Sequence, residues 1–277
     1  MYRSTLSRPL HSLSTPQSRR EAIGVAGRVA AGAVLSSSVV PHLALADAAG
    51  DVEIGMHAFT ILFPAGERIK FDIDYYRDKH MAIIERLYGN TIKRFELRKP
   101  IVVPGGPPSK YAAVINMWIP DTKAFAEASK EHGASLVKDK ENFTNSMQIV
   151  QNDLVYGEAG MGAKAVKIGD PCLTILYPHV AGDHFDYDYY RDHHLTSIMK
   201  LYGSKAISRY EMRKGLANPI GSAPLPYSCT VNIYIADQQS FDEAGKMYQK
   251  TLAGDVPNFS SVNPVAIPTT VYGVVDS

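Results

Sequence analysis

The pentapeptide Thr-Ile-Leu-Phe-Pro at residues 60–64 returns as Thr-Ile-Leu-Tyr-Pro at residues 174–178, which is 114 positions later. The same interval separates Tyr-Tyr-Arg-Asp at residues 75–78 from its copy at residues 189–192. A period above 100 residues is too long for the units of a solenoid, so the repeat indicates two similar domains in one chain. The fold can therefore be worked out for one copy and applied to both.

The interval between the copies lengthens along the chain, which indicates two single-residue insertions. Residues 96–99 match residues 211–214 at an interval of 115, and residues 142–143 match residues 258–259 at an interval of 116. The matches run from about 54 to 157 and from 168 to 273. We therefore expect a first domain at residues 47–157, a linker at 158–167 and a second domain at 168–277.

The predicted elements of one copy follow the order strand, helix, strand, strand, helix, strand. Hydrophobic spacing places the strands of the first copy at residues 57–63, 94–99, 111–119 and 150–156. It places the helices at residues 71–88 and after Asp121, with Asp72 and Asp121 as their N-caps. This order is that of a ferredoxin-like α+β unit with its helices on one face of an antiparallel sheet. The other face needs a cover, because the first and third strands are apolar on both faces. We predict that the two units face each other in an intramolecular pseudo-dimeric α/β barrel.

Length and charge limit the class of protein. The chain has 277 residues, is 45% hydrophobic and carries a formal net charge of +1. This length is sufficient for two domains with buried cores. The chain lacks the basic excess that is typical of nucleic-acid-binding proteins, so we expect no nucleic acid as partner. Further association of the pseudo-dimer stays open.

The first 46 residues have the pattern of an export signal. Residues 18–23 resemble a twin-arginine motif, a weakly apolar run follows at 23–40, and Ala44-Leu45-Ala46 matches a cleavage site. The apolar run is too short and too rich in small residues for a membrane span. We expect cleavage after Ala46 and a periplasmic protein without membrane association. The alternative is a disordered tail with a chance Arg-Arg pair.

The motifs of the second copy resemble those of the EthD family of dimeric α/β-barrel proteins. They are Leu176-Tyr177-Pro178, Phe185-Asp186, Tyr189-Tyr190, His194, Leu201-Tyr202-Gly203, Pro224-x-Pro226-Tyr227 and Asp255-Val256-Pro257-Asn258-Phe259. The first copy keeps most of them but has Lys140-Glu141 in place of Val256-Pro257. The resemblance implies a ferredoxin-like barrel and a small-molecule pocket that uses the histidine of the first helix. It does not imply one reaction, because barrel relatives include cofactor-free oxygenases, polyketide cyclases, decarboxylases and haem enzymes.

The first helix of each copy carries the candidate catalytic residues. Tyr76 and His80 are four positions apart on its apolar stripe, and Tyr190 and His194 repeat the pair. A desolvated imidazole is neutral and can act as general base or acid, while the tyrosine can orient it or donate to an oxyanion. The alternative is a hydrogen-bonded core histidine without a catalytic role.

The candidate substrate-binding residues are polar or aromatic side chains on two strands of each copy: Arg98, Arg213, Asn116, Asn232, Trp118 and Tyr234. The arginines lie on the charged face of an alternating strand. They either anchor an anionic or phenolate group or belong to an ion-pair ladder. The asparagines lie in apolar runs and need a buried partner, which is either a ligand or the opposite sheet.

Neither the acidic residues nor the two cysteines give a firm site. The acidic and histidine-rich residues 184–193 have Lys70 and Lys79 at matching positions of the first copy, so no metal site is predicted. Cys172 and Cys229 begin the first and third strands of the second copy. They form either a disulfide or two small buried side chains, and both readings stay open.

We predict an exported enzyme, without a cofactor, that acts on a small aromatic or polyketide-like molecule by histidine-based proton transfer. The reaction would be decarboxylation, dehydration, cyclisation or cofactor-free oxygenation. One alternative is a haem-binding redox enzyme of the same barrel superfamily, and another is a non-catalytic small-molecule-binding module. The second copy is nearer to the family pattern, so we expect it to hold the working site.

Overall fold

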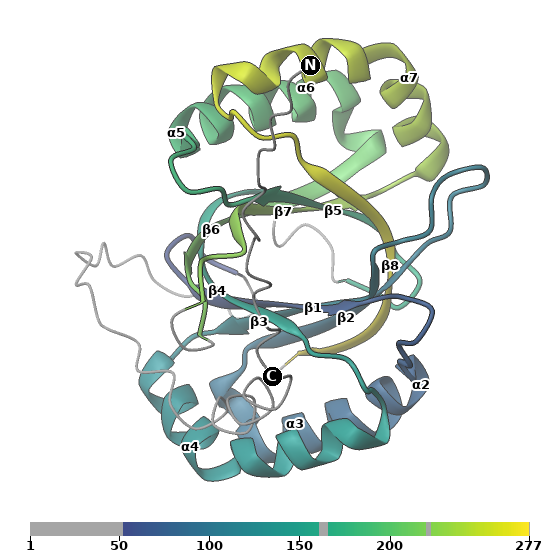
Figure 1. The fold of residues 1–277 in the computed structure, drawn as a ribbon. Coiled ribbons are helices and arrows are strands. Elements are labelled where there is room, and N and C mark those ends of the chain that lie inside the picture. The colour runs from purple at the N-terminus through teal and green to yellow at the C-terminus, as the bar shows by residue number, and fades with distance from the viewer. Residues whose placement is uncertain (1–51, 161–165, 220–222, 277) are drawn as a thin grey trace, which may run out of the picture.

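The computed structural model describes residues 52–160, 166–219 and 223–276, which form an α+β barrel (Figure 1). The signal segment predicted at residues 1–46 lies outside the described residues. The first half, residues 57–159, contains β1 (His57–Pro64), α2 (Ile73–Tyr75), a π-helical turn (Tyr76–His80), α3 (Met81–Tyr88), β2 (Arg94–Pro100), β3 (Tyr111–Ile119), α4 (Thr122–Asp139) and β4 (Ile149–Ala159). The second half, residues 171–276, contains β5 (Pro171–Pro178), α5 (Tyr187–Tyr189), a π-helical turn (Tyr190–Leu195), α6 (Thr196–Ala206), β6 (Ile207–Ala217), β7 (Tyr227–Ile235), α7 (Gln238–Asp255) and β8 (Val265–Asp276).

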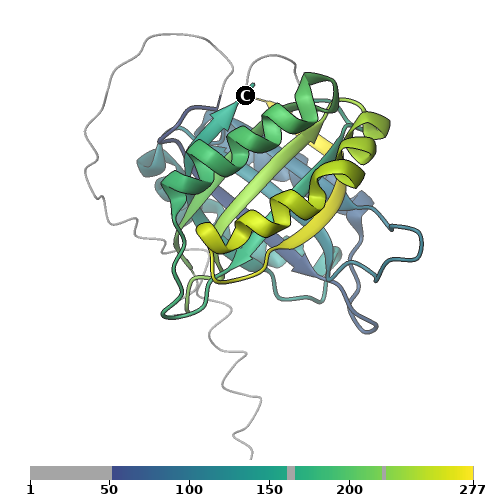
Figure 2. The same cartoon turned by 90° about the horizontal axis from the view of Figure 1, so that it is seen from above.

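The strands form one closed antiparallel barrel in the order β1-β3-β2-β8-β5-β7-β6-β4. Two of its strand pairs join the halves, because β2 pairs with β8 and β4 pairs with β6. Helices α3 and α4 cover one side of the barrel and α6 and α7 cover the opposite side (Figures 1 and 2). The α+β class predicted from the sequence is confirmed. The sheet face that the helices leave bare is buried because the barrel closes on itself.

The first helix of each half begins as the sequence predicts but is not a regular α-helix. The Asp72 side chain accepts a hydrogen bond from the Tyr75 backbone N–H at 2.9 Å, and Asp186 caps the second half in the same way. In the turn that follows, the Met81 backbone N–H donates to the Tyr76 carbonyl oxygen, five residues earlier. Such π-helical turns often occur at functional sites. A hydrophobic period of 3.6 residues does not reveal them.

The side chains on the two faces of each strand lie in different environments, one beneath the helices and the other inside the barrel. Phe59 and Phe63 of β1 pack in the apolar core beneath α3 and α4. The intervening Leu62 faces the barrel interior, where it packs in a cluster with residues of both halves. Thr60 also faces the interior and donates a 2.6 Å hydrogen bond to the buried Asp153. The barrel therefore encloses polar groups as well as the apolar residues predicted for its inner face.

The last strand of each half contacts the first helix of the other half. The Tyr156 hydroxyl donates to Asp188 at 2.8 Å, and the Tyr272 hydroxyl donates to Asp74 at 2.6 Å. A Cβ atom at Gly157 would lie 2.9 Å from a side-chain carbon of the second half's π-helical turn. The repeated Tyr-Gly motif therefore keeps strand and helix close where the halves meet.

The structure excludes a disulfide between the two cysteines. Both are buried and free. Cys172 pairs in register with Tyr234, whereas Cys229 pairs with Tyr177, so the two lie five positions apart along antiparallel strands. That is a separation of roughly 17 Å. They also face opposite ways, since Cys172 packs in the barrel interior and Cys229 beneath the helices. Of the two readings that the sequence left open, the structure therefore supports two buried side chains, because the starts of antiparallel neighbours lie at opposite ends.

One strand extends past the predicted end of the first domain. Strand β4 continues to Ala159, two residues into the predicted linker, and its last residues pair with β6.

Across residues 52–160, 166–219 and 223–276, no helix is long and apolar enough to cross a membrane.

Candidate functional site

A buried histidine and a partly buried aspartate from two different helices form a pair in the first half. His80 closes the π-helical turn, and Asp139 is the last residue of α4. The His80 Nδ1 atom lies 2.7 Å from Asp139 Oδ2. The other carboxylate oxygen accepts hydrogen bonds from the Tyr75 hydroxyl at 3.0 Å and from the Asn142 side-chain amide at 2.9 Å. These bonds fix the carboxylate against the imidazole.

The second half contains the same arrangement. The His194 Nδ1 atom lies 2.7 Å from Asp255 Oδ2. The Tyr189 hydroxyl donates to the other oxygen at 2.9 Å, and the Asn258 amide donates to it at 2.7 Å. Each histidine is therefore held by an acid that lies about 60 residues further along the chain.

The environment keeps both imidazoles neutral and fixes their tautomer. Burial lowers the pKa of His80 and of His194, and the hydrogen bonds to the aspartates offset only part of this effect. Although burial opposes it, hydrogen bonds from His80, Asn142 and Tyr75 hold the pKa of Asp139 below its usual value. Because a carboxylate only accepts, the histidine proton lies on Nδ1. The Nε2 lone pair is then available to accept a proton.

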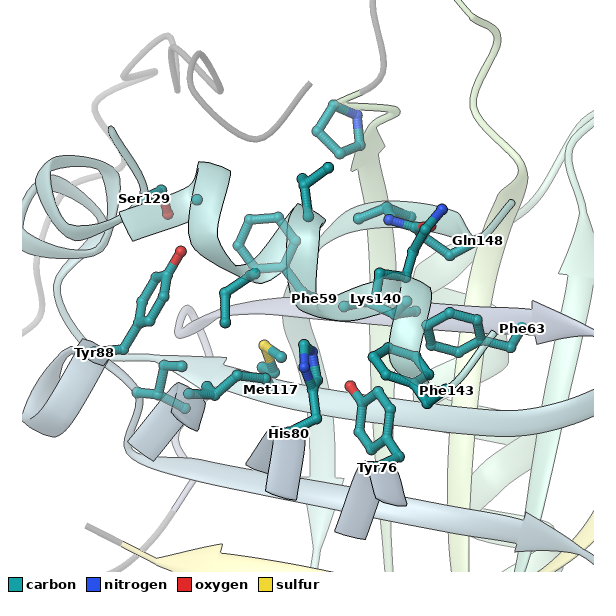
Figure 3. A pocket seen from close by; sticks show the side chains of 18 of the residues that line it. Phe59, Phe63, Tyr76, His80, Tyr88, Met117, Ser129, Lys140, Phe143 and Gln148 are labelled. Carbon is teal, nitrogen blue, oxygen red and sulfur yellow. The ribbon is translucent and has the colours of Figure 1, made fainter. Parts of the chain in front are cut away.

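An apolar cavity of about 230 Å³ lies between helices α3 and α4 and the outer face of the sheet in the first half (Figure 3). His80 and Tyr76 line it. Most of its wall is aromatic or aliphatic: Phe59, Ile61, Phe63, Ile84, Ile92, Met117, Phe125, Leu136, Val137, Phe143 and Val150. Tyr88, Ser129, Lys140 and Gln148 are its other polar residues, and Pro219 reaches it from the second half. The cavity lies in the first half, whereas the sequence led us to expect the working site in the second.

The tyrosine predicted to act with each histidine lies beside it. The Tyr76 and His80 rings have centroids 4.8 Å apart, and the Tyr190 and His194 rings are stacked at 5.2 Å. In Figure 3 the Tyr76 hydroxyl and the His80 ring point toward the same space. Burial raises the pKa of Tyr76, so its phenol stays protonated and acts as a donor.

The six residues predicted to bind substrate do not line this cavity. They lie on the other face of the sheet, inside the barrel. Arg98 is fully buried there and contacts Glu96 at 2.6 Å and the Asn232 side-chain oxygen at 2.8 Å. Asn232 donates to Asn116 at 3.3 Å, and the Tyr234 hydroxyl donates to Glu96 at 3.1 Å.

The corresponding residues of the second half complete the barrel network. Arg213 pairs with Glu211, and the Trp118 indole N–H donates to Glu211 at 2.6 Å. Arg213 also donates to Thr60 of the first half at 3.2 Å. The structure therefore separates the predicted catalytic residues from the predicted substrate-binding residues. The arginines have the ion-pair geometry of the simpler interpretation, and the asparagines contact the opposite sheet.

Sequence reasoning missed the two aspartates that hold the histidines. The signal was present, because Asp139 and Asp255 correspond at the interval of 116 that relates Asn142 to Asn258. Both copies have an aspartate at the end of the second helix and a histidine on the first helix. The presence of both residues in both copies points to such a pair. Nothing in local spacing, however, indicates that the residues touch.

No family model matches the sequence, and no curated protein matches it. Solved structures do match. An EthD-like protein from Ralstonia eutropha is 24% identical, with 40% of this chain and 93% of that chain covered and a TM-score of 0.34. An anthrone oxidase-like protein is 9% identical, with 81% and 94% covered and a TM-score of 0.55. A proposed monooxygenase from Fusobacterium nucleatum is 8% identical, with 81% and 95% covered and a TM-score of 0.50. The last two similarities establish that this barrel fold occurs in other proteins.

Proposed function

We propose that this protein is an EthD-like enzyme in which His80 removes a proton from a small aromatic or polyketide-like molecule bound in the cavity. The observation that carries the proposal is the His80–Asp139 pair, which leaves a neutral Nε2 atom at an apolar cavity. A general base in this state accepts a proton at neutral pH. We further propose that the chain is a tandem duplication of a ferredoxin-like domain, exported through its twin-arginine signal.

The chemistry begins with abstraction of a proton beside a carbonyl group. The proton moves to Nε2, and the resulting imidazolium is stabilised by the Asp139 carboxylate. The electron pair moves onto the carbonyl oxygen, where the protonated Tyr76 hydroxyl donates a hydrogen bond. The enolate is the common starting point for decarboxylation, dehydration, ring closure and reaction with dioxygen. The largely apolar wall of the cavity limits its contact with water.

The proposal is tested with 2-tetralone, a two-ring ketone with an acidic C–H group beside its carbonyl. In deuterated water, proton abstraction exchanges that hydrogen for deuterium, which NMR follows directly. We expect His80→Gln to lower the protein-catalysed exchange rate by about 10²- to 10⁴-fold, which is the usual contribution of a general base. His194→Gln is the matched control and should keep the exchange. Equal rates in wild type and His80→Gln would contradict the proposal.

A haem-binding function is the second candidate, and the residues fit it only in part. His80 donates its Nδ1–H to the Asp139 carboxylate. A histidine held in this way through one ring nitrogen is a typical metal ligand through the other. The volume of about 230 Å³ is below the roughly 300–1,000 Å³ of pockets for larger ligands. Haemin titration checks this directly: a Soret band that shifts with wild type but not with His80→Gln would favour haem.

A non-catalytic binding module is the third candidate. It predicts saturable binding of aromatic ketones without deuterium exchange at any pH between about 6 and 9, the range in which a neutral imidazole is present. The exchange experiment therefore separates it from the enzyme.

A further inference from the structure

Lys140 is a cation in the lining of the cavity, and its hydrogen-bond partners in the described part of the chain are neutral groups. It follows Asp139 at the end of α4 and lines the cavity with Gln148 (Figure 3). Its Nζ atom donates to the Ser146 carbonyl oxygen at 3.2 Å and to Gln148 Oε1 at 3.4 Å. Within the described part of the chain, no carboxylate lies within 4.0 Å of it.

The second half shows that the fold does not need a cation at this position. Val256 directly follows the last residue of α7, as Lys140 directly follows the last residue of α4, and Pro264 stands where Gln148 stands. A lysine at a helix C-terminus gains some stability from the helix dipole, but a valine occupies the equivalent place in the same architecture. Lys140 and Gln148 therefore form a polar pair at the cavity that the second half lacks.

An unpaired ammonium group beside an apolar wall favours an anion in that cavity. The wall supplies few other polar groups, and a charge-assisted hydrogen bond in a partly desolvated site is stronger than one in water. The volume of the cavity limits the size of the aromatic part of such an anion. A cavity of about 150 Å³ lined by aliphatic and aromatic residues accepts benzene, so about 230 Å³ accepts roughly two fused rings.

We propose that the cavity binds a one- or two-ring aromatic molecule bearing an anionic oxygen group, a carboxylate or an enolate, and that Lys140 selects this group. The inference rests on the proposed function, whose pocket it uses. Lys140 would hold the anionic end, and the reacting carbon would then lie on the side of His80 and Tyr76.

The test compares two probes of nearly equal size and shape, the anion 2-naphthoate and the neutral 2-naphthamide, by calorimetric titration of the full chain. We expect 2-naphthoate to bind wild type about tenfold more tightly than 2-naphthamide. Lys140→Met keeps most of the length of the side chain and removes its charge, so it should weaken 2-naphthoate about tenfold and leave 2-naphthamide unchanged. Lys140→Arg should keep most of the preference. Circular dichroism and thermal unfolding verify that the variants are folded.

A cavity-filling variant separates the two proposals. Ser129→Phe places a ring in the cavity from α4 and should abolish binding of both probes. Equal affinity of wild type for both probes, or equal weakening of both by Lys140→Met, would overturn the role of Lys140 and leave the proposed pocket intact. If wild type bound neither probe, the proposed function would fail, and the role of Lys140 would fail with it.

Discussion

The Nδ1 atom of His80 lies 2.7 Å from the Oδ2 atom of Asp139, although 59 residues separate the two in the chain. The pair joins the π-helical turn of the first helix to the end of the second. Its counterpart, His194 with Asp255, has the same distance. Both pairs thus depend on the two helices of each half lying side by side on the sheet.

Asp139→Asn should change the tautomer of His80 and lower its activity as a base. An amide offers a donor as well as an acceptor, so the Nδ1–H bond loses its charged partner. We expect two-bond ¹H–¹⁵N correlation spectra to show the proton on Nδ1 in wild type and a mixture of tautomers in the variant. The 2-tetralone exchange rate should fall on the order of 10²-fold or more.

Asp255→Asn is the matched control for that experiment. It alters the pair of the second half, so the tautomer of His194 should change while the exchange rate stays within about twofold of wild type. A large loss of exchange in Asp255→Asn alone would instead assign the working site to the second half.

The stability of the protein should fall as the pH drops below about 6.5. Burial lowers the pKa of both histidines in the folded state, so the unfolded chain binds more protons in this range and acid favours unfolding. Each unit by which a pKa is lowered contributes at most about 1.4 kcal/mol per histidine. Urea unfolding at pH 7.5 and pH 5.0 measures the effect. The difference between the two pH values should shrink in the double variant His80→Gln/His194→Gln, and an unchanged difference would show that other groups cause it.

Arg98→Met should destabilise the barrel without affecting the cavity. The substitution leaves the fully buried Glu96 without its cation, and breaking a buried pair in this way typically costs about 3–5 kcal/mol. The double variant Arg98→Met/Glu96→Leu removes both charges and should recover most of the loss. Chemical denaturation measures both free energies of unfolding.

The same variants test whether Arg98 binds substrate. Because Arg98 lies inside the barrel, on the far side of the sheet from the cavity, the folded double variant should bind 2-naphthoate as wild type does. If the double variant is folded but no longer binds 2-naphthoate, Arg98 has the substrate-binding role predicted from the sequence.

Both cysteines should remain reduced and unreactive in the folded protein. Burial raises the pKa of the Cys172 thiol to about 12 and that of Cys229 well above its usual value. Dithionitrobenzoate without reductant should therefore release no thiol colour from the native protein and two equivalents from the protein in guanidinium. A result of zero equivalents in guanidinium would indicate a disulfide.

The sequence alone determined the order of elements and the buried positions of the candidate catalytic residues. Repeats at intervals of 114–116 residues gave that order twice, and helical spacing put His80 and His194 on buried faces, where they are 6% and 5% exposed. The caps at Asp72 and Asp121 were predicted as well, because capping chemistry is local. These features depend on periodicity and on neighbours within a few residues.

Only the tertiary structure decided which buried environment each side chain enters and which partner it meets. Alternation along β2 shows that Arg98 faces away from Leu97, but it does not tell a barrel interior from a ligand pocket, because both bury the residue. The contact of His80 with Asp139, the position of Lys140 at the cavity and the distance between the cysteines depend on how helices and antiparallel strands pack across the chain. Local periodicity carries no information about that packing.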